Sequence, residues 1–301
     1  MKRFLLKIFS YLILVFLIGN IGAWSALKIL GRSYFYKPNF IVNHFEGKGR
    51  FDYVIAGSSR GLTTINTEEV DRQTGLKGLN ISMDDTGLPS QFLMIKHFFE
   101  SGNQADRVIL TLDLGHFEES EQMLNDNDYR FVSYSHRDYI WEYFYTYEKG
   151  VIRPLTLSNY FPVFAIGYYN LELVWPAGLS LIKPTYTNRF DWNGNYSYPN
   201  SSLQSKSEEI QWEIIEKQPS NPILKEIESY LKQKNSQLIL YVGPYLGKQL
   251  VVPGGNGSDF PLINHSAIFT EAKYFFDVDH VNDLGKAEAT QKFVEALEPF
   301  R

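Results

Sequence analysis

The sequence predicts an α/β fold in which helices cover both faces of a parallel sheet. The main observation is that short apolar segments of strand length alternate with segments of helical period, both before residue 115 and after residue 218. A charge-free run near the N-terminus adds a transmembrane helix. A long aromatic-rich stretch without a clear period adds an insertion between the two halves of the sheet domain.

The N-terminal segment, residues 1–30, is predicted to be a transmembrane anchor. Ile8–Leu27 is twenty residues long and carries no charge, which matches the thickness of a bilayer core at helical rise. Three bases precede it, and the positive-inside rule then keeps the N-terminus in the cytoplasm and exports the remainder: Lys2, Arg3 and Lys7. The alternative is a cleaved signal peptide with a small-residue site at Ala23–Ala26.

Residues 31–50 read as a linker, and the sheet domain is predicted to occupy residues 51–301. In its first half we expect three strands, which are Phe51–Ala56, Leu76–Ser82 and Arg107–Leu112. Two helices lie between them. One is capped by Asn66 with Glu69 and ends at Gly75, and the other runs from Ser90 to Gly102.

The insertion is expected at about residues 115–218, where Tyr, Phe and Trp are dense. After it, the alternation resumes with a helix that has Pro222 in its first turn. The following elements are predicted in order: a strand at Gln237–Val242, a Gly-rich loop at Lys248–Pro261, a strand at Tyr274–Phe276, and a last helix that begins near Asp283.

Composition excludes several classes of function. Residues 1–32 contain five bases and no acid, so the remaining chain holds 24 bases against 34 acids, a net charge of −10. An acidic body argues against a nucleic-acid partner. The chain has no cysteine, which excludes a thiolate nucleophile and Cys-ligated metals. No two of the six histidines stand at metal-ligand spacing, so we expect no metal and no cofactor.

Two short motifs stand at predicted strand ends, where ligands bind in parallel sheets. The first strand is followed by Gly57-Ser58-Ser59-Arg60, and the Tyr274–Phe276 strand is followed by Asp277-Val278-Asp279-His280. Each has an ordinary interpretation as turn or helix-capping residues. Together they match a serine nucleophile, a histidine base and an aspartate that orients the imidazole.

At these residues the chain resembles the SGNH/GDSL hydrolase superfamily. Its first block, Gly-Asp-Ser, corresponds to Gly57-Ser58-Ser59, and its last block, Asp-x-x-His, corresponds to Asp277 and His280. The resemblance implies a three-layer, flavodoxin-like sheet of SGNH type and the catalytic residues Ser59, Asp277 and His280. The sequences of both motifs are similar to those of the membrane-anchored branch of this superfamily. That branch includes DltD-like and alginate-acetylation-type proteins, which handle acyl groups on cell-envelope polymers.

The remaining blocks match less well. The family's second block supplies a glycine N–H to the oxyanion hole, and Gly87 is the best counterpart, so the resemblance implies an oxyanion hole from Ser59 and Gly87. The third block, Gly-x-Asn-Asp, has no counterpart after Leu112. His116 could replace its Asn donor, and Arg60 and His116 are the candidate substrate contacts. As an alternative, His116 forms only a surface pair with Glu118.

The resemblance implies a serine acyltransferase or esterase that acts on acyl groups, most simply acetyl, of an exported envelope polysaccharide. The acceptor would be a polysaccharide or polyol hydroxyl, and a membrane-bound acyltransferase would be the partner that delivers the acyl group. One alternative is a non-catalytic envelope protein that binds a glycan or scaffolds a synthesis complex. Another is a secreted lipase or esterase acting alone. A Ser59 Oγ within hydrogen-bond reach of His280 Nε2 would favour the enzyme over the binder.

Overall fold

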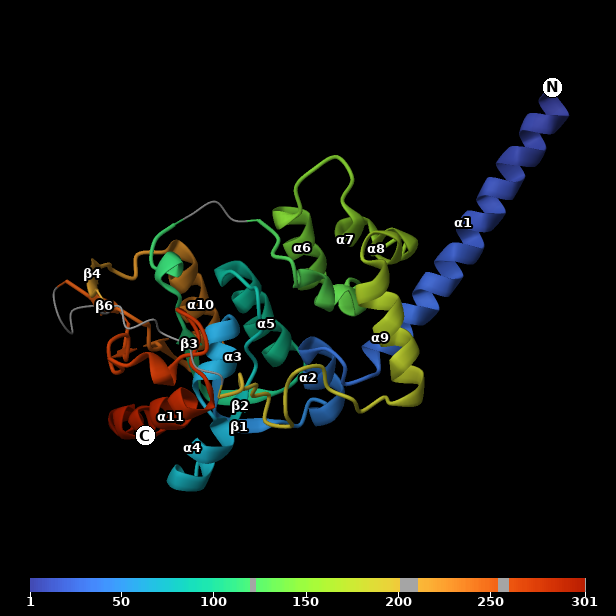
Figure 1. Ribbon diagram of the computed structural model, residues 1–301. Coiled ribbons are helices and arrows are strands. Elements are labelled where there is room, and N and C mark those ends of the chain that lie inside the picture. Colours follow the sequence, from blue (N-terminus) through green and yellow to red (C-terminus); the bar gives the residue numbers. More distant parts are fainter. Residues whose placement is uncertain (120–122, 201–210, 254–259, 301) are drawn as a thin grey trace. The chain divides into compact units, whose positions relative to one another are not determined.

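The computed structural model describes residues 1–119, 123–200, 211–253 and 260–300 (Figure 1). The chain divides into two compact units. The helical unit consists of Met1–Phe45 and Asp128–Asn188. The sheet unit consists of Glu46–Asn127 and Arg189–Arg301. The expected insertion at about residues 115–218 is therefore divided between the two units. Its middle, Asp128–Asn188, belongs to the helical unit, and its two ends belong to the sheet unit.

The sheet unit is built on five parallel strands, which confirms the predicted α/β class. Their order across the sheet is β2-β1-β3-β5-β7. The strands are β1 (Arg50–Ala56), β2 (Gly78–Asn80), β3 (Gln104–Thr111), β5 (Gln237–Val242) and β7 (Leu262–Asn264). Because all five run in the same direction, their carboxyl ends meet at one edge of the sheet.

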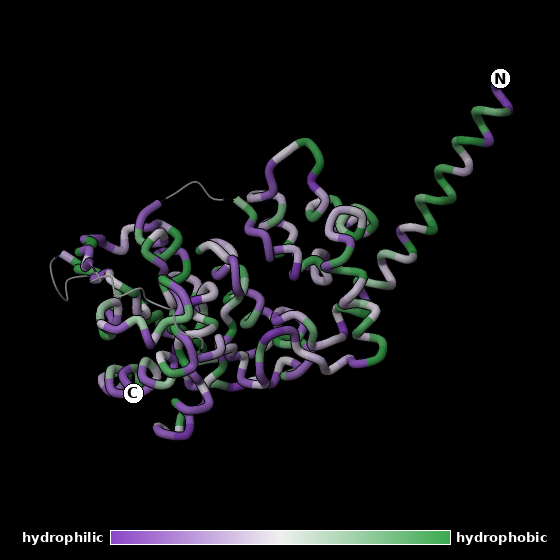
Figure 2. The backbone as a smooth tube through the Cα atoms, in the orientation of Figure 1, coloured by the Kyte–Doolittle hydropathy of each residue, from purple (hydrophilic) through white to green (hydrophobic). Residues whose placement is uncertain are grey.

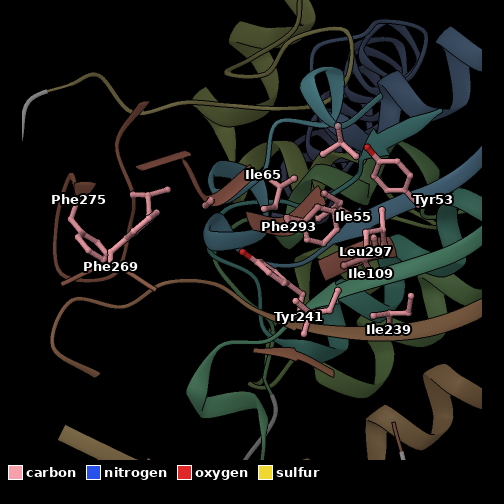
Figure 3. Packing of buried hydrophobic residues seen from close by; sticks show 14 residues of the cluster. Tyr53, Ile55, Ile65, Ile109, Ile239, Tyr241, Phe269, Phe275, Phe293 and Leu297 are labelled. Atoms are coloured by element: carbon pink, nitrogen blue, oxygen red, sulfur yellow. The ribbon is translucent and has the colours of Figure 1, made fainter. Parts of the chain in front are cut away.

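Side-chain alternation along the strands builds two separate apolar layers. On one face, Tyr53, Ile109 and Tyr241 are fully buried against helices α4 (Thr67–Thr74) and α11 (Asp283–Leu297), and Phe293 of α11 packs into this cluster (Figure 3). On the other face, Val54, Val108 and Leu240 are fully buried. That face is covered by α5 (Leu88–Glu100) and α10 (Pro222–Gln233).

The helix boundaries follow local capping chemistry. The side chain of Asn66 accepts the Glu68 N–H at 3.1 Å, and α4 ends at Gly75, whose φ of +73° is the left-handed region that glycine tolerates best. Glu69 does not complete the predicted capping box and instead pairs with Arg72. α10 begins as predicted, with Pro222 in its first turn after an Asn221 cap.

Two predictions in the C-terminal half are wrong. Tyr274–Phe276 is not a strand: a 3₁₀ turn, η4 (Ala272–Tyr274), ends there, and Phe276 donates its N–H to the nearby His280 carbonyl. The fifth strand of the sheet is β7. The predicted Gly-rich loop begins instead with β6 (Lys248–Val251), which pairs in parallel with β4 (Glu213–Glu216) in a second small sheet. Residues 254–259 of that loop lie outside the described residues.

The helical unit combines the N-terminal segment with the middle of the chain. Its elements are α1 (Lys2–Gly31), α2 (Lys37–Phe45), η2 (Asp128–Tyr134), α6 (Asp138–Tyr147), α7 (Pro154–Leu157), α8 (Val163–Tyr168) and α9 (Asn170–Ile182). Among the described residues, α1 alone is long and apolar enough to cross a membrane. The predicted linker, residues 31–50, contains α2, which buries Phe40 and Ile41. Helix α2 is therefore a packed element of the helical unit, whereas residues 46–50 belong to the sheet unit.

We predict that His265, next to β7, makes the chain sensitive to acid. Burial, with a smaller contribution from Lys292, lowers the pKa of His265 to about 4, and Glu295 only partly opposes this. As the pH falls below about 6.5, the unfolded chain takes up a proton that the folded chain resists. The His265→Gln variant should therefore lose about 2 kcal/mol less unfolding free energy than the parent between pH 7 and pH 4.5. Equal losses for parent and variant, measured by denaturant unfolding in detergent, would contradict this.

Candidate active site

Ser59 stands at the carboxyl end of β1, in the first turn of α3 (Ser59–Thr64). The preceding Ser58 caps the helix, because its Oγ accepts the Arg60 N–H at 3.3 Å. At Gly57 the backbone passes so close to β3 that a Cβ would lie 2.9 Å from the Thr111 Cβ. A glycine at this position therefore allows the tight turn that presents Ser59 at the edge of the sheet.

The second motif forms a closed turn after η4. One carboxylate oxygen of Asp277 accepts the N–H groups of Asp279 and His280, at 2.9 and 2.8 Å. The bridge between Phe275 and Val281 closes the base of this turn. The His280 ring lies with Nδ1 2.9 Å from both Asp277 oxygens, so the carboxylate holds both the backbone and the imidazole.

The structure brings the two motifs together, although 221 positions separate Ser59 from His280. His280 Nε2 lies 2.8 Å from Ser59 Oγ. An Nδ1–H donated to Asp277 leaves Nε2 free to accept the serine proton, which is the arrangement of a serine nucleophile with its base. Burial alone would raise the pKa of Asp277, but hydrogen bonds from Asp279 and His280 outweigh it and lower that pKa. The carboxylate thus stays ionised beside the imidazole.

Arg60 is a clamp within the protein, and its predicted contact with substrate stays a prediction. Its side chain is almost fully buried. The guanidinium donates to the carbonyls of Asp279 (2.5 Å), Gly243 (2.8 Å) and Pro244 (3.1 Å). Its Nε also lies 3.2 Å from Asp113. Arg60 therefore joins the loops that follow β1, β3 and β5 to the turn that carries His280.

Gly87 is the N-cap of α5, but its N–H already has an acceptor. It donates to Asn125 Oδ1 at 2.7 Å, so the predicted oxyanion donor is occupied by a carboxamide oxygen in this structure. By contrast, no acceptor within the described residues takes the Ser59 N–H. Of the two predicted oxyanion donors, the structure therefore leaves Ser59 available.

His116 belongs to the short turn η1 (Leu114–His116), which follows β3. Its Nδ1 accepts the Asp113 N–H at 3.4 Å, which leaves the proton of a neutral ring on Nε2. Burial lowers the pKa of His116, with Asp113 partly opposing. The ring is thus a neutral hydrogen-bond donor rather than a partner of Glu118, which pairs with Lys217 instead.

Tyr198 is the site residue that sequence reasoning missed. Its ring packs edge-on against His280 with centroids 5.3 Å apart and stacks on Phe276 at 4.3 Å. Its backbone carbonyl accepts the N–H of Asp283, at the start of α11. Lys286 secures the same segment by donating to the Tyr196 carbonyl at 2.8 Å. The only signal in the sequence was the aromatic richness of the insertion, which marks no single residue.

The described parts of the chain hold no group of three or more His, Asp or Glu side chains arranged to bind a metal ion. The sequence matches none of the known protein-family models, and no curated protein matches it.

We predict that Arg60→Met destabilises the sheet unit by about 3 kcal/mol, because it leaves buried carbonyls and Asp113 without their cation. Arg60→Lys should recover only part of this loss, since an ammonium cannot reproduce the forked contacts. Denaturant unfolding of the three proteins in detergent measures the effect. Stability within about 0.5 kcal/mol of the parent for Arg60→Met would show that the clamp is not important.

Proposed function

We propose that the chain is a membrane-anchored serine acyltransferase or esterase of SGNH type. The observation that carries the proposal is the continuous contact from Ser59 Oγ through His280 to the Asp277 carboxylate, at 2.8 and 2.9 Å. The strand order supports it: numbered within the sheet, the strands follow the order 2-1-3-4-5 of flavodoxin-like folds. Both motifs stand at the carboxyl edge of that sheet.

The chemistry follows from the residues in place. His280 Nε2 removes the proton from Ser59 Oγ as that oxygen attacks an ester or thioester carbonyl. The tetrahedral intermediate collapses when the imidazolium returns the proton to the leaving oxygen or sulfur, and acyl-Ser59 remains. His280 then deprotonates an acceptor hydroxyl, which attacks the acyl carbon and releases Ser59. Water in place of the acceptor gives hydrolysis by the same steps.

The oxyanion hole is the least complete part of the site. The Ser59 N–H is available, and such a donor contributes about 3 kcal/mol to transition-state stabilisation. The Gly87 N–H can contribute only when the Asn125 carboxamide moves away from it. The donor tautomer of His116 supplies a third candidate on the loop after β3, where the family has its Asn.

The substrate side of the proposal rests on the membrane anchor. Helix α1 carries bases before its apolar run and no acid, which favours a cytoplasmic N-terminus and an exported body. An exported enzyme at the bilayer surface can receive acyl groups from a membrane-bound acyltransferase. It can pass them, most simply as acetyl, to an envelope polysaccharide or polyol hydroxyl.

Two observations favour a second candidate, a non-catalytic glycan-binding or scaffold protein. The Gly87 N–H is satisfied internally, and the loop after β3 lacks the Asn of the family's third block. In such a protein, the contact between Ser59 and His280 would stabilise the fold without taking part in catalysis. The reactivity of Ser59 separates the two proposals.

For the enzyme, Ser59→Ala should abolish covalent labelling by a fluorophosphonate probe, because the nucleophilic oxygen is gone. Asp277→Asn should slow labelling roughly 10²–10⁴-fold, since the amide no longer holds the correct tautomer of His280. The matched control is Ser58→Ala. It changes the neighbouring serine, which caps α3 through the Arg60 N–H, and should leave labelling in place. Gel fluorescence of the full chain in detergent gives the rates.

If Ser59→Ala labels as strongly as the parent, Ser59 is not the nucleophile. If the parent does not label at all while circular dichroism shows it folded, the binding or scaffold function is favoured instead.

Tyr198 is expected to influence the acceptor more than the first acylation step. Its ring covers one side of His280 and can pack against a sugar, as aromatic faces commonly do. Tyr198→Ala should lower the ratio of transfer to hydrolysis with a soluble polyol acceptor, while fluorophosphonate labelling of Ser59 changes little. Tyr198→Phe keeps the ring and should retain the ratio. An unchanged ratio in Tyr198→Ala would exclude this role.

A further inference from the structure

The helical unit contains a second apolar region besides α1. Pro154–Ile182 spans 29 residues and carries one charge, Glu172, with Arg153 and Lys183 at its borders. In Figure 2, green apolar residues recur along α8 and α9, with white and purple residues between them. Several large side chains of this region are exposed, among them Phe161, Tyr168, Leu171, Val174, Trp175 and Ile182. An apolar surface of this kind marks an interaction site.

This region packs on α1 well inside the apolar run. The ring of Phe16 lies 5.4 Å from that of Phe161 and 6.3 Å from that of Phe164. The Val163 N–H donates to Asn20 Oδ1 at 3.3 Å. The contacts with α1 therefore lie at Phe16 and Asn20, near the middle of Ile8–Leu27, and from Gly19 onward α1 is partly covered by its own unit.

The uncovered part of α1 is too short to cross a bilayer. The charge-free residues that precede the covered part are Ile8–Ile18, eleven residues or about 16 Å of helix. A hydrocarbon core is about 30 Å thick. If α1 spans the membrane, its apolar run must therefore continue to about Leu27, and that portion is the one packed against α8 and α9.

We propose that α8 is itself immersed in the bilayer leaflet that faces the exported body, packed beside α1. This inference rests on the proposed membrane anchor. Immersion accounts for the exposed Phe161, because that side chain contacts α1 at the depth of Phe16. It also explains why Pro154–Leu171 carries no charge and has no amphipathic period, since one face of α8 meets α1 and the other meets lipid.

Polar groups lie where this arrangement places the headgroups. Lys28 stacks over Trp24 at 4.4 Å, near the end of the apolar run, as interfacial pairs do. Glu172 is the only acid in the region, and its backbone carbonyl accepts the hydroxyl of Tyr36, which follows α1 in the chain. This contact keeps Glu172 near the aqueous end of α1 and away from the hydrocarbon centre.

The absence of native cysteine allows single-site labelling of the full chain. We would place one nitroxide at a time on Leu12→Cys of α1, Phe161→Cys and Leu171→Cys. The control is Ile214→Cys, which replaces an exposed apolar residue of the sheet unit. In phosphatidylethanolamine–phosphatidylglycerol vesicles, the label at Phe161 should be about tenfold less accessible to a charged nickel chelate than the label at Ile214, and nearly as protected as that at Leu12. Leu171 should give an intermediate value.

A label at Phe161 that is as accessible as Ile214, while Leu12 is protected, would overturn the immersion of α8 and leave the anchor intact. Exposure at both Leu12 and Phe161 would refute the anchor and this proposal together. Protection of Phe161 that appears only in native membranes would point to a protein partner and also overturn the proposal. Fluorophosphonate labelling of the same variants reports separately on Ser59.

Discussion

The arrangement of the site depends on one buried cation. The guanidinium of Arg60 is held by three backbone carbonyls and by Asp113, and its plane lies 3.4 Å from the ring of Tyr245. Removing a charge from water is costly, and only a full set of partners offsets this cost. Because one of those carbonyls belongs to Asp279, the clamp also holds the turn of His280, although Arg60 Nε and Asp113 Oδ1, 3.2 Å apart, form no hydrogen bond. The position of His280 beside Ser59 therefore depends in part on the contacts of Arg60.

The strands with strong apolar character could be predicted from sequence, and so could the pairing of the two motifs. β1, β3 and β5 lie close to their expected positions because each contains at least four consecutive buried residues. β7 could not be predicted, since it is only three residues long and has no period to detect. Tyr274–Phe276 is equally apolar, but Phe275 enters the core from a turn and not from a strand. Local composition cannot distinguish these two ways to bury a phenylalanine.

The site residues that could not be predicted from sequence were missed for a similar physical reason. Arg60 adjoins a serine in sequence and suggests a substrate contact, yet the carbonyls that it binds lie 183, 184 and 219 residues away along the chain. Tyr198 lies beside His280 in a segment that α11 binds through its backbone, a long-range contact that the local sequence does not reveal. The middle of the chain showed no period because, in the proposed arrangement, α8 contacts apolar surroundings on more than one side. Under the proposed function, the anchor, the lipid-facing helix and the serine site would belong to an enzyme that works at a membrane surface.

The central claim is that Ser59 carries an acyl group during turnover. Exposure of the full chain to 4-nitrophenyl acetate, followed by rapid acid quench and peptide mass spectrometry, tests it most directly. The account predicts one acetyl group on the peptide that contains Ser59, accumulating when the acceptor is withheld and discharged when a polyol is added. Acetylation that is confined to other residues, or a Ser59 peptide that stays unmodified while the ester is consumed, would contradict it.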